Sequence, residues 1–381
     1  MRLGIDASNI RGGGGVTHLV SVLGAADPRA HGIDRVIAWA PRETLDRFPR
    51  RPWLDARTSS ELNGGAVRRL FWQRYVFPRA VRSEADLAWV LGGNAGDGLD
   101  RFVAMSQNIL AFEPGERARY GRSAVGLRLA LLARSQPRTF ARASGALFLT
   151  RYAEGVVRRA VPRMTDRVAV VPHGVEERFR RSPRPQRPIA SYGADAPFRI
   201  LYVSIVDLYK HPWTLAEAVT RLAARGLPVT LDLVGPAYPP ALSRLRETLS
   251  RVDPDGRIVA YRGAVAFEDL PRIYHEADAF AFASSCENMP NILIEAMAAG
   301  LPVACSRRGP MPEVLGEDAC WFDPEDVDGT TEALRRLVED APLRERLAAA
   351  AHARAMPFTW ERCATETLAF LGRVAASRSA F

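Results

Sequence analysis

The chain has 381 residues, 47% of them hydrophobic and 25% charged, so it is long enough for two globular domains of ordinary size. Its four cysteines show no CxxC spacing, which argues against a structural zinc site or a disulfide framework. The net charge of +9 comes from arginine, since Lys210 is the only lysine in the sequence. Such a bias mostly reflects genome composition, so the charge does not indicate a nucleic-acid partner.

The beginning of the chain and its apolar runs indicate where the protein acts. Residues 1–6 have strand character rather than the features of a signal peptide. No apolar run reaches the ~20 residues that a membrane-spanning helix needs. We therefore expect a cytoplasmic protein.

The first α/β unit of the sequence begins with a glycine-rich loop. Residues 3–7 have the pattern of a short buried strand, and the glycines at 12–15 separate it from helical spacing at 16–23. Glycines at such a junction let backbone amides approach a phosphate closely. The pattern is not Gly-x-Gly-x-x-Gly, and no acidic residue follows at the dinucleotide spacing, which excludes the usual nicotinamide site. Taken alone, the loop is a phosphate cradle or a flexible surface turn.

Two stretches of this region mix large apolar side chains with arginine, at residues 68–82 and 117–142. Both can lie on an anionic membrane surface, and both can equally be core-facing helices with arginine-rich solvent sides. Between them, Gln107 and Asn108 follow a predicted strand. We expect these two side chains to lie at the ligand-binding edge of the first sheet.

A Pro-, Arg- and Ser-rich stretch at 180–197 is predicted to be a linker that few contacts cross. After it, apolar runs with strand character alternate with helical patterns, which predicts βαβ units and a parallel sheet. The predicted strands lie at 199–204, 229–234, 258–262, 279–284 and 303–306. Lys210 falls in the first strand-to-helix turn. Because arginine has replaced lysine everywhere else, Lys210 indicates a site that needs a compact point charge.

The most informative stretch joins the strand at 279–284 to a helix that ends at Gly300. Pro290 suits the first helical position, so residues 285–290 form a turn at the carboxyl end of a parallel strand. Ligands of open α/β sheets bind at this end, where the new helix offers N–H groups to an anion. Glu287 lies before the helix and Glu295 within it.

Glu287 and Glu295 are separated by seven residues, and Glu-Ala-Met-Ala-x-Gly-x-Pro-Val continues from Glu295. Two glutamates at this spacing are a weak signal, but their flanking residues make a strong one. The segment resembles the signature of the retaining glycosyltransferases of family 4 and their relatives. The resemblance covers the whole chain, strongly at 198–330 and loosely before.

The resemblance implies the GT-B fold, in which two Rossmann-like α/β domains face a cleft and a C-terminal helix crosses back to the first domain. The expected domains are an acceptor-side domain at 1–190 with the helix at 357–381, and a nucleotide-sugar-binding domain at 191–356. The implied activity is metal-independent transfer of a hexose from a nucleoside-diphosphate sugar to a glycan or lipid-linked acceptor in polysaccharide synthesis. No cofactor is expected, and the inner face of the cell membrane is an alternative location.

The resemblance also assigns roles to individual residues. Lys210 and the amides around Met289 would hold the diphosphate, Glu295 the ribose and Glu287 the sugar, with Glu287 and Lys210 as the catalytic pair. The predicted donor-binding residues are Gly14, Gly15, Ser204, Lys210, Arg262, Gly263, Val265, Glu287, Asn288, Met289, Pro290, Asn291, Ile292 and Glu295. The predicted acceptor-side residues are His18, Gln107 and Asn108.

The chain departs from the family pattern at Ile205, which stands where an arginine usually grips the diphosphate. Arg262, Arg307 and Arg308 are candidates to replace that charge. Many members also carry a histidine near Gln107, and this chain does not. Two Asp-x-Asp pairs, Asp253 with Asp255 and Asp326 with Asp328, fit a turn and a helix start. We therefore predict no metal site.

Two other functions remain open. A sugar-nucleotide 2-epimerase or hydrolase would share the fold but use no acceptor, and free sugar formed without an acceptor would reveal it. A non-catalytic sugar-nucleotide-binding partner of another transferase is the third reading. The presence of Glu287, Glu295 and Lys210 argues against it, whereas Ile205 argues weakly for it.

Overall fold

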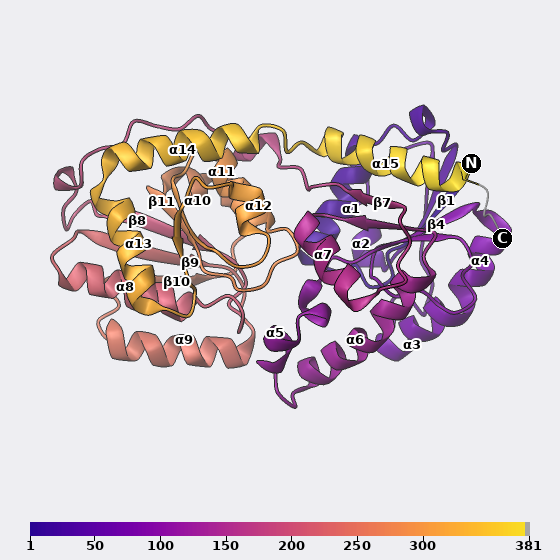
Figure 1. Cartoon of the computed structure of the whole chain (residues 1–381), viewed down its shortest axis with the longest axis horizontal. Coiled ribbons are helices and arrows are strands. Elements are labelled where there is room, and N and C mark those ends of the chain that lie inside the picture. Colours follow the sequence, from indigo (N-terminus) through magenta and orange to yellow (C-terminus); the bar gives the residue numbers. More distant parts are fainter. Residues whose placement is uncertain (378–381) are drawn as a thin grey trace. The chain divides into compact units, whose positions relative to one another are not determined.

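The computed structural model describes residues 1–377, and these form two compact units (Figure 1). Unit 1 comprises Met1–Arg117, Gly121–Gly174 and the end of the chain from Phe358. Unit 2 comprises Ala118–Tyr120 and Val175–Pro357. Each unit has a parallel sheet of its own, so the predicted α/β class with two Rossmann-like domains is confirmed.

The sheet of unit 1 has seven strands in the order β3-β2-β1-β4-β5-β6-β7. All of its neighbouring pairs are parallel. Its central strands β4 and β5 are entirely buried, as expected where helices cover both faces. The strands are β1 (Arg2–Asp6), β2 (Arg35–Trp39), β3 (Leu54–Arg57), β4 (Leu87–Val90), β5 (Phe102–Met105), β6 (Gly145–Phe148) and β7 (Val168–Val170).

Helices connect these strands on both sides of the sheet. They are α1 (Gly13–Ala25), α2 (Arg42–Leu45), α3 (Ala66–Phe71), α4 (Phe77–Glu84), α5 (Pro114–Ala118), α6 (Ala124–Arg142), α7 (Arg151–Ala160) and α15 (Trp360–Ala376). The π-helical turn η2 (Trp72–Val76) joins α3 to α4, and short 3₁₀ turns occur at η1 (Arg29–His31) and η3 (Ile109–Phe112). The glycines of residues 12–15 open α1, as predicted, with Gly13 at φ +60°.

The sheet of unit 2 has six parallel strands in the order β10-β9-β8-β11-β12-β13. They are β8 (Phe198–Val203), β9 (Val229–Val234), β10 (Val259–Gly263), β11 (Ala279–Phe282), β12 (Val303–Ser306) and β13 (Cys320–Phe322). The helices are α8 (Pro212–Ala224), α9 (Pro239–Val252), α10 (Leu270–Glu276), α11 (Asn291–Ala298), α12 (Met311–Leu315), α13 (Val327–Glu339) and α14 (Ala341–Ala355), with 3₁₀ turns at η4 (Glu177–Phe179) and η5 (Ile189–Ser191). The five predicted strands of this domain correspond to β8–β12.

The stretch 180–197, predicted to be an interdomain linker, lies within unit 2 and packs on it. The Arg181 N–H donates to the Ala298 carbonyl at 2.9 Å, and the Arg344 Nε donates to the Gln186 Oε1 at 3.1 Å. A Cβ at Gly300 would lie 2.7 Å from the Arg181 carbonyl oxygen, so the stretch is packed directly on the end of α11. Because these contacts belong to unit 2, the chain enters that unit at Val175 rather than near residue 190.

The C-terminal helix α15 belongs to unit 1, as the predicted fold requires, and it lies against α1. The chain reaches it through a tight contact, since a Cβ at Gly174 would lie 2.3 Å from the Trp360 backbone nitrogen. Glycine is therefore needed at this position. The last strand-end loop of unit 1 and the start of α15 are consequently held together.

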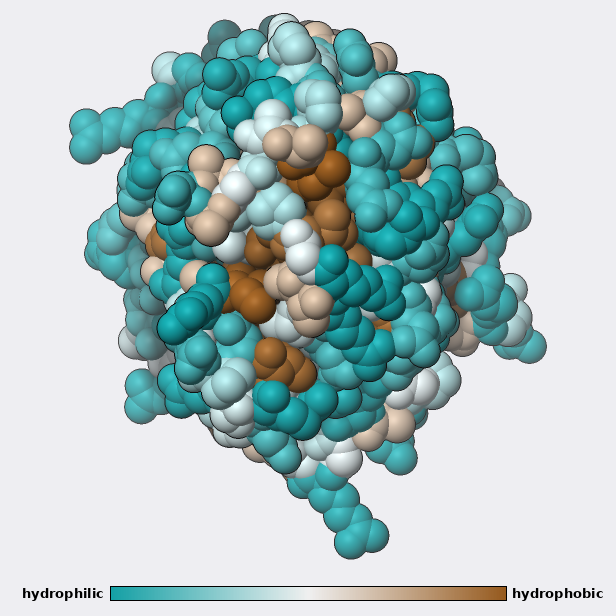
Figure 2. Space-filling view, turned by 90° about the vertical axis from the view of Figure 1, so that its left-hand side faces the viewer, coloured by the Kyte–Doolittle hydropathy of each residue, from teal (hydrophilic) through white to brown (hydrophobic). Residues whose placement is uncertain are grey.

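The surface and the cysteines fit the composition. Figure 2 shows one face of the molecule on which hydrophilic side chains surround a small hydrophobic strip. Within residues 1–377, no helix has both the length and the apolar content needed to cross a membrane. All four cysteines are buried, and no disulfide links them.

Candidate functional site

The predicted site residues of unit 2 gather where its strand order reverses. Successive strands run outward from β8 through β9 to β10, and from β11 through β12 to β13 on the other side. The switch point of an open parallel sheet therefore lies between β8 and β11, and such points are where ligands bind. Lys210 follows β8 and Glu287 follows β11, so the topology alone brings their two turns together.

Lys210 and Glu287 form an ion pair that is nearly closed to solvent. The Lys210 Nζ donates to the Glu287 Oε1, and the two side chains are only 6% and 12% exposed. The Tyr202 hydroxyl donates to the Lys210 carbonyl at 2.9 Å and so fixes the backbone of the same turn. In a pair this buried, each charge compensates the other, and removing either partner leaves an uncompensated charge.

The two turns are also joined through their backbones. The Ser285 N–H donates to the Tyr209 carbonyl at 2.8 Å, and the His211 Nε2 lies 3.1 Å from the Ser285 Oγ. His211 has φ +45°, and it is the only non-glycine residue with positive φ among residues 1–377. A left-handed residue directly before Pro212 ends the turn and starts α8. Local strain of this kind persists where surrounding contacts over-determine it, which is common at functional sites.

Glu295 lies one turn inside α11 and is fully enclosed by the protein. The Tyr274 hydroxyl lies 3.0 Å from the Glu295 Oε2 and 3.1 Å from the Ile292 carbonyl oxygen. Burial raises the pKa of Glu295 to about 7, although the Tyr274 hydrogen bond opposes the shift. This carboxyl therefore sits in a low-dielectric pocket with one fixed donor and capacity to accept others.

The remaining predicted residues of the second turn surround the start of α11. Asn288 and Met289 are buried, and α11 begins at Asn291 with Pro290 directly before it, one residue later than predicted. The Asn291 Oδ1 is buried and has no hydrogen-bond partner among the described residues. The helix has no acidic residue in its first turn. Its N-terminus thus keeps the capacity to bind an anion.

The other donor-side residues lie at the ends of β8 and β10. Ser204 is buried directly after β8, and its carbonyl oxygen would lie 2.0 Å from a Cβ at Gly235, so Gly235 is required there. Gly263 closes β10 with φ +68°, and Val265 follows it. Ile205, in the place of the family arginine, is exposed.

None of the three arginines considered as substitutes for the charge at Ile205 is free of acidic partners. Arg262 donates to both carboxylate oxygens of Asp232 at 2.9 and 2.8 Å. Arg307 pairs with Glu317 at 3.2 Å. Arg308 pairs with both Asp323 and Glu325 at distances of 2.6–2.9 Å. The charge of each of these arginines is therefore already shared with at least one carboxylate, as the charge of Lys210 is shared with Glu287.

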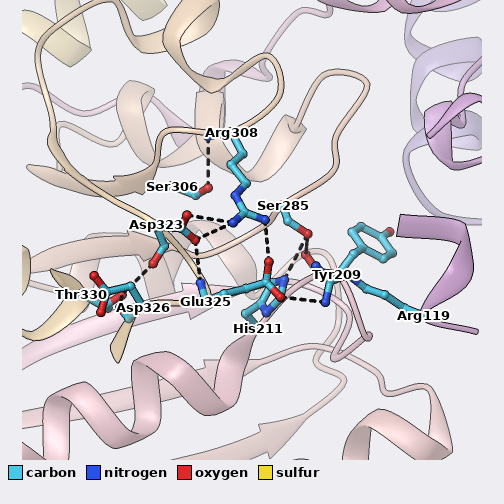
Figure 3. A network of polar contacts seen from close by, with 10 residues as sticks. All are labelled: Arg119, Tyr209, His211, Ser285, Ser306, Arg308, Asp323, Glu325, Asp326 and Thr330. Carbon is cyan, nitrogen blue, oxygen red and sulfur yellow. Dashed lines mark hydrogen bonds and ion pairs between the residues drawn. The ribbon is translucent and has the colours of Figure 1, made fainter. Parts of the chain in front are cut away.

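Arg308 belongs to a network that spans several turns of unit 2 (Figure 3). Glu325 also accepts from Arg119 at 3.0 Å, and these arginines lower the pKa of Glu325 to about 2, with Arg119 the largest cause. Asp326 caps α13 by accepting from the Asp328 N–H at 3.0 Å. Asp253 accepts the N–H groups of residues 257–259. Both Asp-x-Asp pairs therefore have structural roles.

In unit 1, the predicted site residues around α1 form two groups: an open part, whose residues are exposed or half-buried, and a closed part, which is fully buried. Gly15 and Gln107 touch, because a Cβ at Gly15 would lie 2.4 Å from the Gln107 Oε1. Both polar atoms of the Gln107 amide are buried without a partner among the described residues. Gly14 lies in the same first turn of α1. Asn108, which follows Gln107 in the chain, is exposed, and its Oδ1 accepts from the Leu110 N–H at 2.9 Å.

His18 lies in the closed part. Its Nδ1 is 2.9 Å from the Nδ1 of His173, and the rings of Trp89 and Trp360 lie against it. Burial lowers the pKa of His18 to about 3. Burial is also the main cause that lowers the pKa of His173, and the neighbouring His18 is the second cause. Since His18 is fully buried, it contacts the core of unit 1, and contact with an acceptor would require this cluster to open.

Sequence reasoning missed the residues that hold the site in place. Tyr274 orients Glu295 from α10, and Tyr209, His211 and Ser285 lock the two turns together. Tyr274 reads in the sequence as an ordinary core aromatic residue. His211 carried a weak signal, because a residue between Lys210 and Pro212 must reverse the chain before a helix that starts at proline.

Comparison with known proteins identifies unit 2. Residues 197–340 match the family model of the glycosyl transferases group 1. Unit 2 carries a glycosyl transferases group 1 domain. The Glu287 and Glu295 motif predicted a glycosyltransferase of family 4 or a relative. The match confirms the broader class, the group 1 glycosyl transferases, for residues 197–340.

Curated relatives match part of the chain over part of their own length. O-antigen chain mannosyltransferase B of Escherichia coli is 37% identical over 110 residues, which is 29% of each chain. D-inositol 3-phosphate glycosyltransferase of a Nocardioides species is 31% identical over 183 residues, covering 44% of this chain and 40% of the relative. The matched stretch thus spans well under half of these relatives.

Solved structures resemble the chain over nearly its whole length. Anabaena HepE in complex with UDP has a TM-score of 0.68 at 19% identity, covering 96% of this chain and 99% of its own. Sucrose-phosphate synthase of Thermosynechococcus elongatus has a TM-score of 0.72 at 19% identity, covering 96% and 97%. At these identities the likeness establishes the shared GT-B fold of the two units.

Proposed function

We propose that the protein is a retaining glycosyltransferase that moves a hexose from a nucleoside-diphosphate sugar to a glycan or lipid-linked acceptor in cell-surface polysaccharide synthesis. The observation that carries the proposal is the buried Lys210–Glu287 pair at the switch point of the group 1 domain, beside the start of α11. The matched relatives include a mannosyltransferase and a glycosyltransferase, which supports the same class. Neighbouring structures bound to UDP and UDP-glucose support a nucleotide sugar as donor.

In the proposed complex, the donor diphosphate replaces Glu287 as the partner of Lys210. Breaking the glycosidic phosphate bond builds negative charge on the diphosphate, so a fixed cation and the α11 amides stabilise the transition state. Glu287 is then released to accept hydrogen bonds from the sugar hydroxyls. Glu295 accepts from the ribose hydroxyls, since its carboxyl already has one fixed donor in Tyr274.

Retention of configuration means that the acceptor attacks the face from which the diphosphate leaves. The acceptor oxygen bonds to the anomeric carbon as the bond to the phosphate oxygen breaks, and the departing phosphate takes the acceptor's proton. No protein nucleophile is assigned. Gly14 and Gly15 stay proposed donor-binding residues and Gln107 a proposed acceptor-side residue, because the buried Gln107 amide has both a donor and an acceptor group without a partner among the described residues.

The proposed reaction needs no metal ion, since Lys210 and the α11 N-terminus neutralise the diphosphate. Among residues 1–377, no three His, Cys, Asp or Glu side chains gather in a group that could hold a metal. Turnover in EDTA equal to turnover in Mg²⁺ or Mn²⁺ is expected. Activity that EDTA abolishes and Mn²⁺ restores would contradict this part of the proposal.

The decisive experiment has two stages. A thermal-shift screen with UDP, GDP and ADP identifies the base, because a ligand at ~100 times its dissociation constant stabilises by about 2.7 kcal/mol. The matching hexose donors are then incubated with and without glycan or lipid-linked acceptors. Product formed only with acceptor supports the transferase. Free sugar or a 2-epimer formed without acceptor would instead support the epimerase or hydrolase, and binding without turnover would support a partner protein.

A further inference from the structure

The exposed hydrophobic side chains of the protein are concentrated on two helices of unit 1. Eight large hydrophobic side chains are exposed among the described residues, and six of them lie on α3, η2 and α6. These six are 47% to 81% exposed. They are Val67, Leu70, Phe71, Tyr75, Leu127 and Leu131.

The spacing of these residues gives each helix an outward apolar row. Val67, Leu70 and Phe71 are three and four positions apart, and Leu127 and Leu131 are four apart, so each set shares one helical face. The inward side of the α3 and η2 segment packs on unit 1 through other side chains. Trp72 is buried against Phe77, with ring centroids 5.1 Å apart. The outward residues therefore are not needed to attach the helix to unit 1.

The two rows belong to the same surface of unit 1. Asp97 pairs with Arg74 of η2 at 2.5 Å and with Arg142 of α6 at 3.3 Å, so one loop bridges the two segments. Arg69 and Arg128 also lie within electrostatic reach, since burial, Arg11 and then Arg128 lower the pKa of Arg69. Figure 1 draws α3 and α6 as neighbours in this unit. We call this surface, made by α3, η2 and α6, the arginine-rich apolar face.

Its charge is one-sided. The helical segments α3, η2 and α6 contain seven arginines and no aspartate or glutamate. The acids nearest to it are Asp97 and, at the α3 end, Glu43 and Glu61, which neighbour Arg69 and Arg68. Most of the arginines are therefore available to an external anion, while the apolar rows stand between them.

We propose that the arginine-rich apolar face docks on an anionic lipid surface, with Phe71, Leu131 and their neighbours in the headgroup–acyl boundary. An interface of this kind accepts apolar side chains and phosphate-contacting arginines together. A purely protein partner would need acidic groups opposite these arginines, whereas anionic headgroups supply negative charge at high density. The inference does not depend on the proposed reaction, because none of these residues lies in the candidate site.

The test is co-sedimentation of the full chain with vesicles of phosphatidylcholine alone and with vesicles that also contain phosphatidylglycerol. Binding to the anionic vesicles only is expected. Raising the salt from about 0.1 M to 1 M shortens the screening length from ~10 to ~3 Å and should release the protein. Equal binding to neutral vesicles, or no binding to anionic ones, would overturn the proposal.

Matched variants separate this face from general basicity. Arg68→Gln with Arg128→Gln should weaken binding by roughly fivefold per arginine, the equivalent of ~1 kcal/mol each. Phe71→Ser with Leu131→Ser should also weaken it. Arg246→Gln on α9 and Met356→Ser, both exposed in unit 2, should leave it unchanged. Loss of binding in these controls to the same degree would overturn the assignment of the face.

A second copy of this chain is the competing occupant. Analytical ultracentrifugation of the wild type and of the Phe71→Ser, Leu131→Ser variant distinguishes the two. A monomeric wild type that binds anionic vesicles is the expected result. A dimer that dissociates in the variant, with no vesicle binding by the wild type, would assign the face to self-association and overturn the lipid proposal.

Discussion

The ion pair between Lys210 and Glu287 changes how the role of each residue is interpreted. In isolation each is a candidate ligand-binding charge, but in the fold the two form an ion pair in a buried turn. The free protein thus keeps both charges compensated until a diphosphate arrives.

Lys210→Ala is expected to lower turnover roughly a hundredfold, about 3 kcal/mol in the barrier, because the lost charge acts most strongly as the diphosphate departs. Lys210→Arg should restore little, since the site accommodates a compact ammonium rather than a planar fork. The double variant Lys210→Ala, Glu287→Gln removes the unpaired carboxylate and so separates folding from catalysis. Normal steady-state turnover of the single alanine variant would place the charge elsewhere.

Glu287→Gln is expected to lower turnover, because its carboxylate meets the sugar, without lowering nucleoside diphosphate affinity, because the carboxylate that competes with the diphosphate for Lys210 is removed. An interaction made mainly in the transition state has this signature. Glu295→Gln should weaken nucleoside diphosphate and donor binding alike. Calorimetric titration of both variants with the diphosphate and the full donor provides the comparison, and equal loss of diphosphate affinity would refute the assignment of Glu287.

Glu295 gives the protein a predictable pH dependence. Its pKa rises from 4.5 to about 7 on folding, so the folded state binds more protons in that window and stability falls as pH rises through it. The loss amounts to about 3 kcal/mol at ~1.4 kcal/mol per pKa unit. Buried His18 and His173 act in the opposite direction over the same pH range, so the loss is measured as a difference between two proteins. Chemical denaturation at pH 5 and pH 8 should show that the stability of the wild type relative to Glu295→Gln falls as pH rises. Parallel pH profiles of the two proteins would contradict it.

At the scale of elements, the stretch 180–197 behaves as an integral part of unit 2 rather than as a linker. Gly300, at the end of α11, adopts φ +70° and lies against the backbone of Arg181 and Pro183. Gly226 has φ +87°, yet a Cβ there meets nothing within 4 Å. A comparison of the two glycines therefore distinguishes the cost of backbone strain from the cost of close packing.

Gly226→Ala is expected to cost about 1 kcal/mol from the left-handed backbone alone. Gly300→Ala should cost clearly more, because its Cβ would also displace the 181–183 backbone. Urea denaturation of both variants measures the difference. Equal costs would mean that the 180–197 stretch yields easily and is not anchored at Gly300.

At the scale of the whole molecule, the two parallel sheets assign different tasks to the two units. The candidate nucleotide-binding residues with direct mutual contacts all lie in unit 2, on turns after β8 and β11. Unit 1 carries the Gly15–Gln107 contact and the arginine-rich apolar face. This division predicts where a bound nucleotide will protect the chain.

Hydrogen exchange with saturating nucleoside diphosphate should slow most in residues 205–212 and 285–293, with smaller changes around residues 13–15. Local opening of these turns becomes rarer when a ligand bridges them. The helices α3 and α6 serve as the internal control, since they are expected to exchange at the same rate with and without ligand. Protection centred on those helices would contradict the placement of the nucleotide site.

The sequence by itself determined the elements and the motif, because their signals are local. Alternating strand and helix patterns, Pro290 near a helix start and the Glu287-to-Glu295 spacing all act over a few residues, so they can be read without a fold. The lone lysine was informative for the same reason. Tertiary structure alone decided the ion pair between Lys210 and Glu287, the pairing of Tyr274 with Glu295 and the burial of His18. It also decided that residues 180–197 are anchored. These contacts join residues far apart in the chain, and their geometry depends on strand order and packing, which no local pattern encodes.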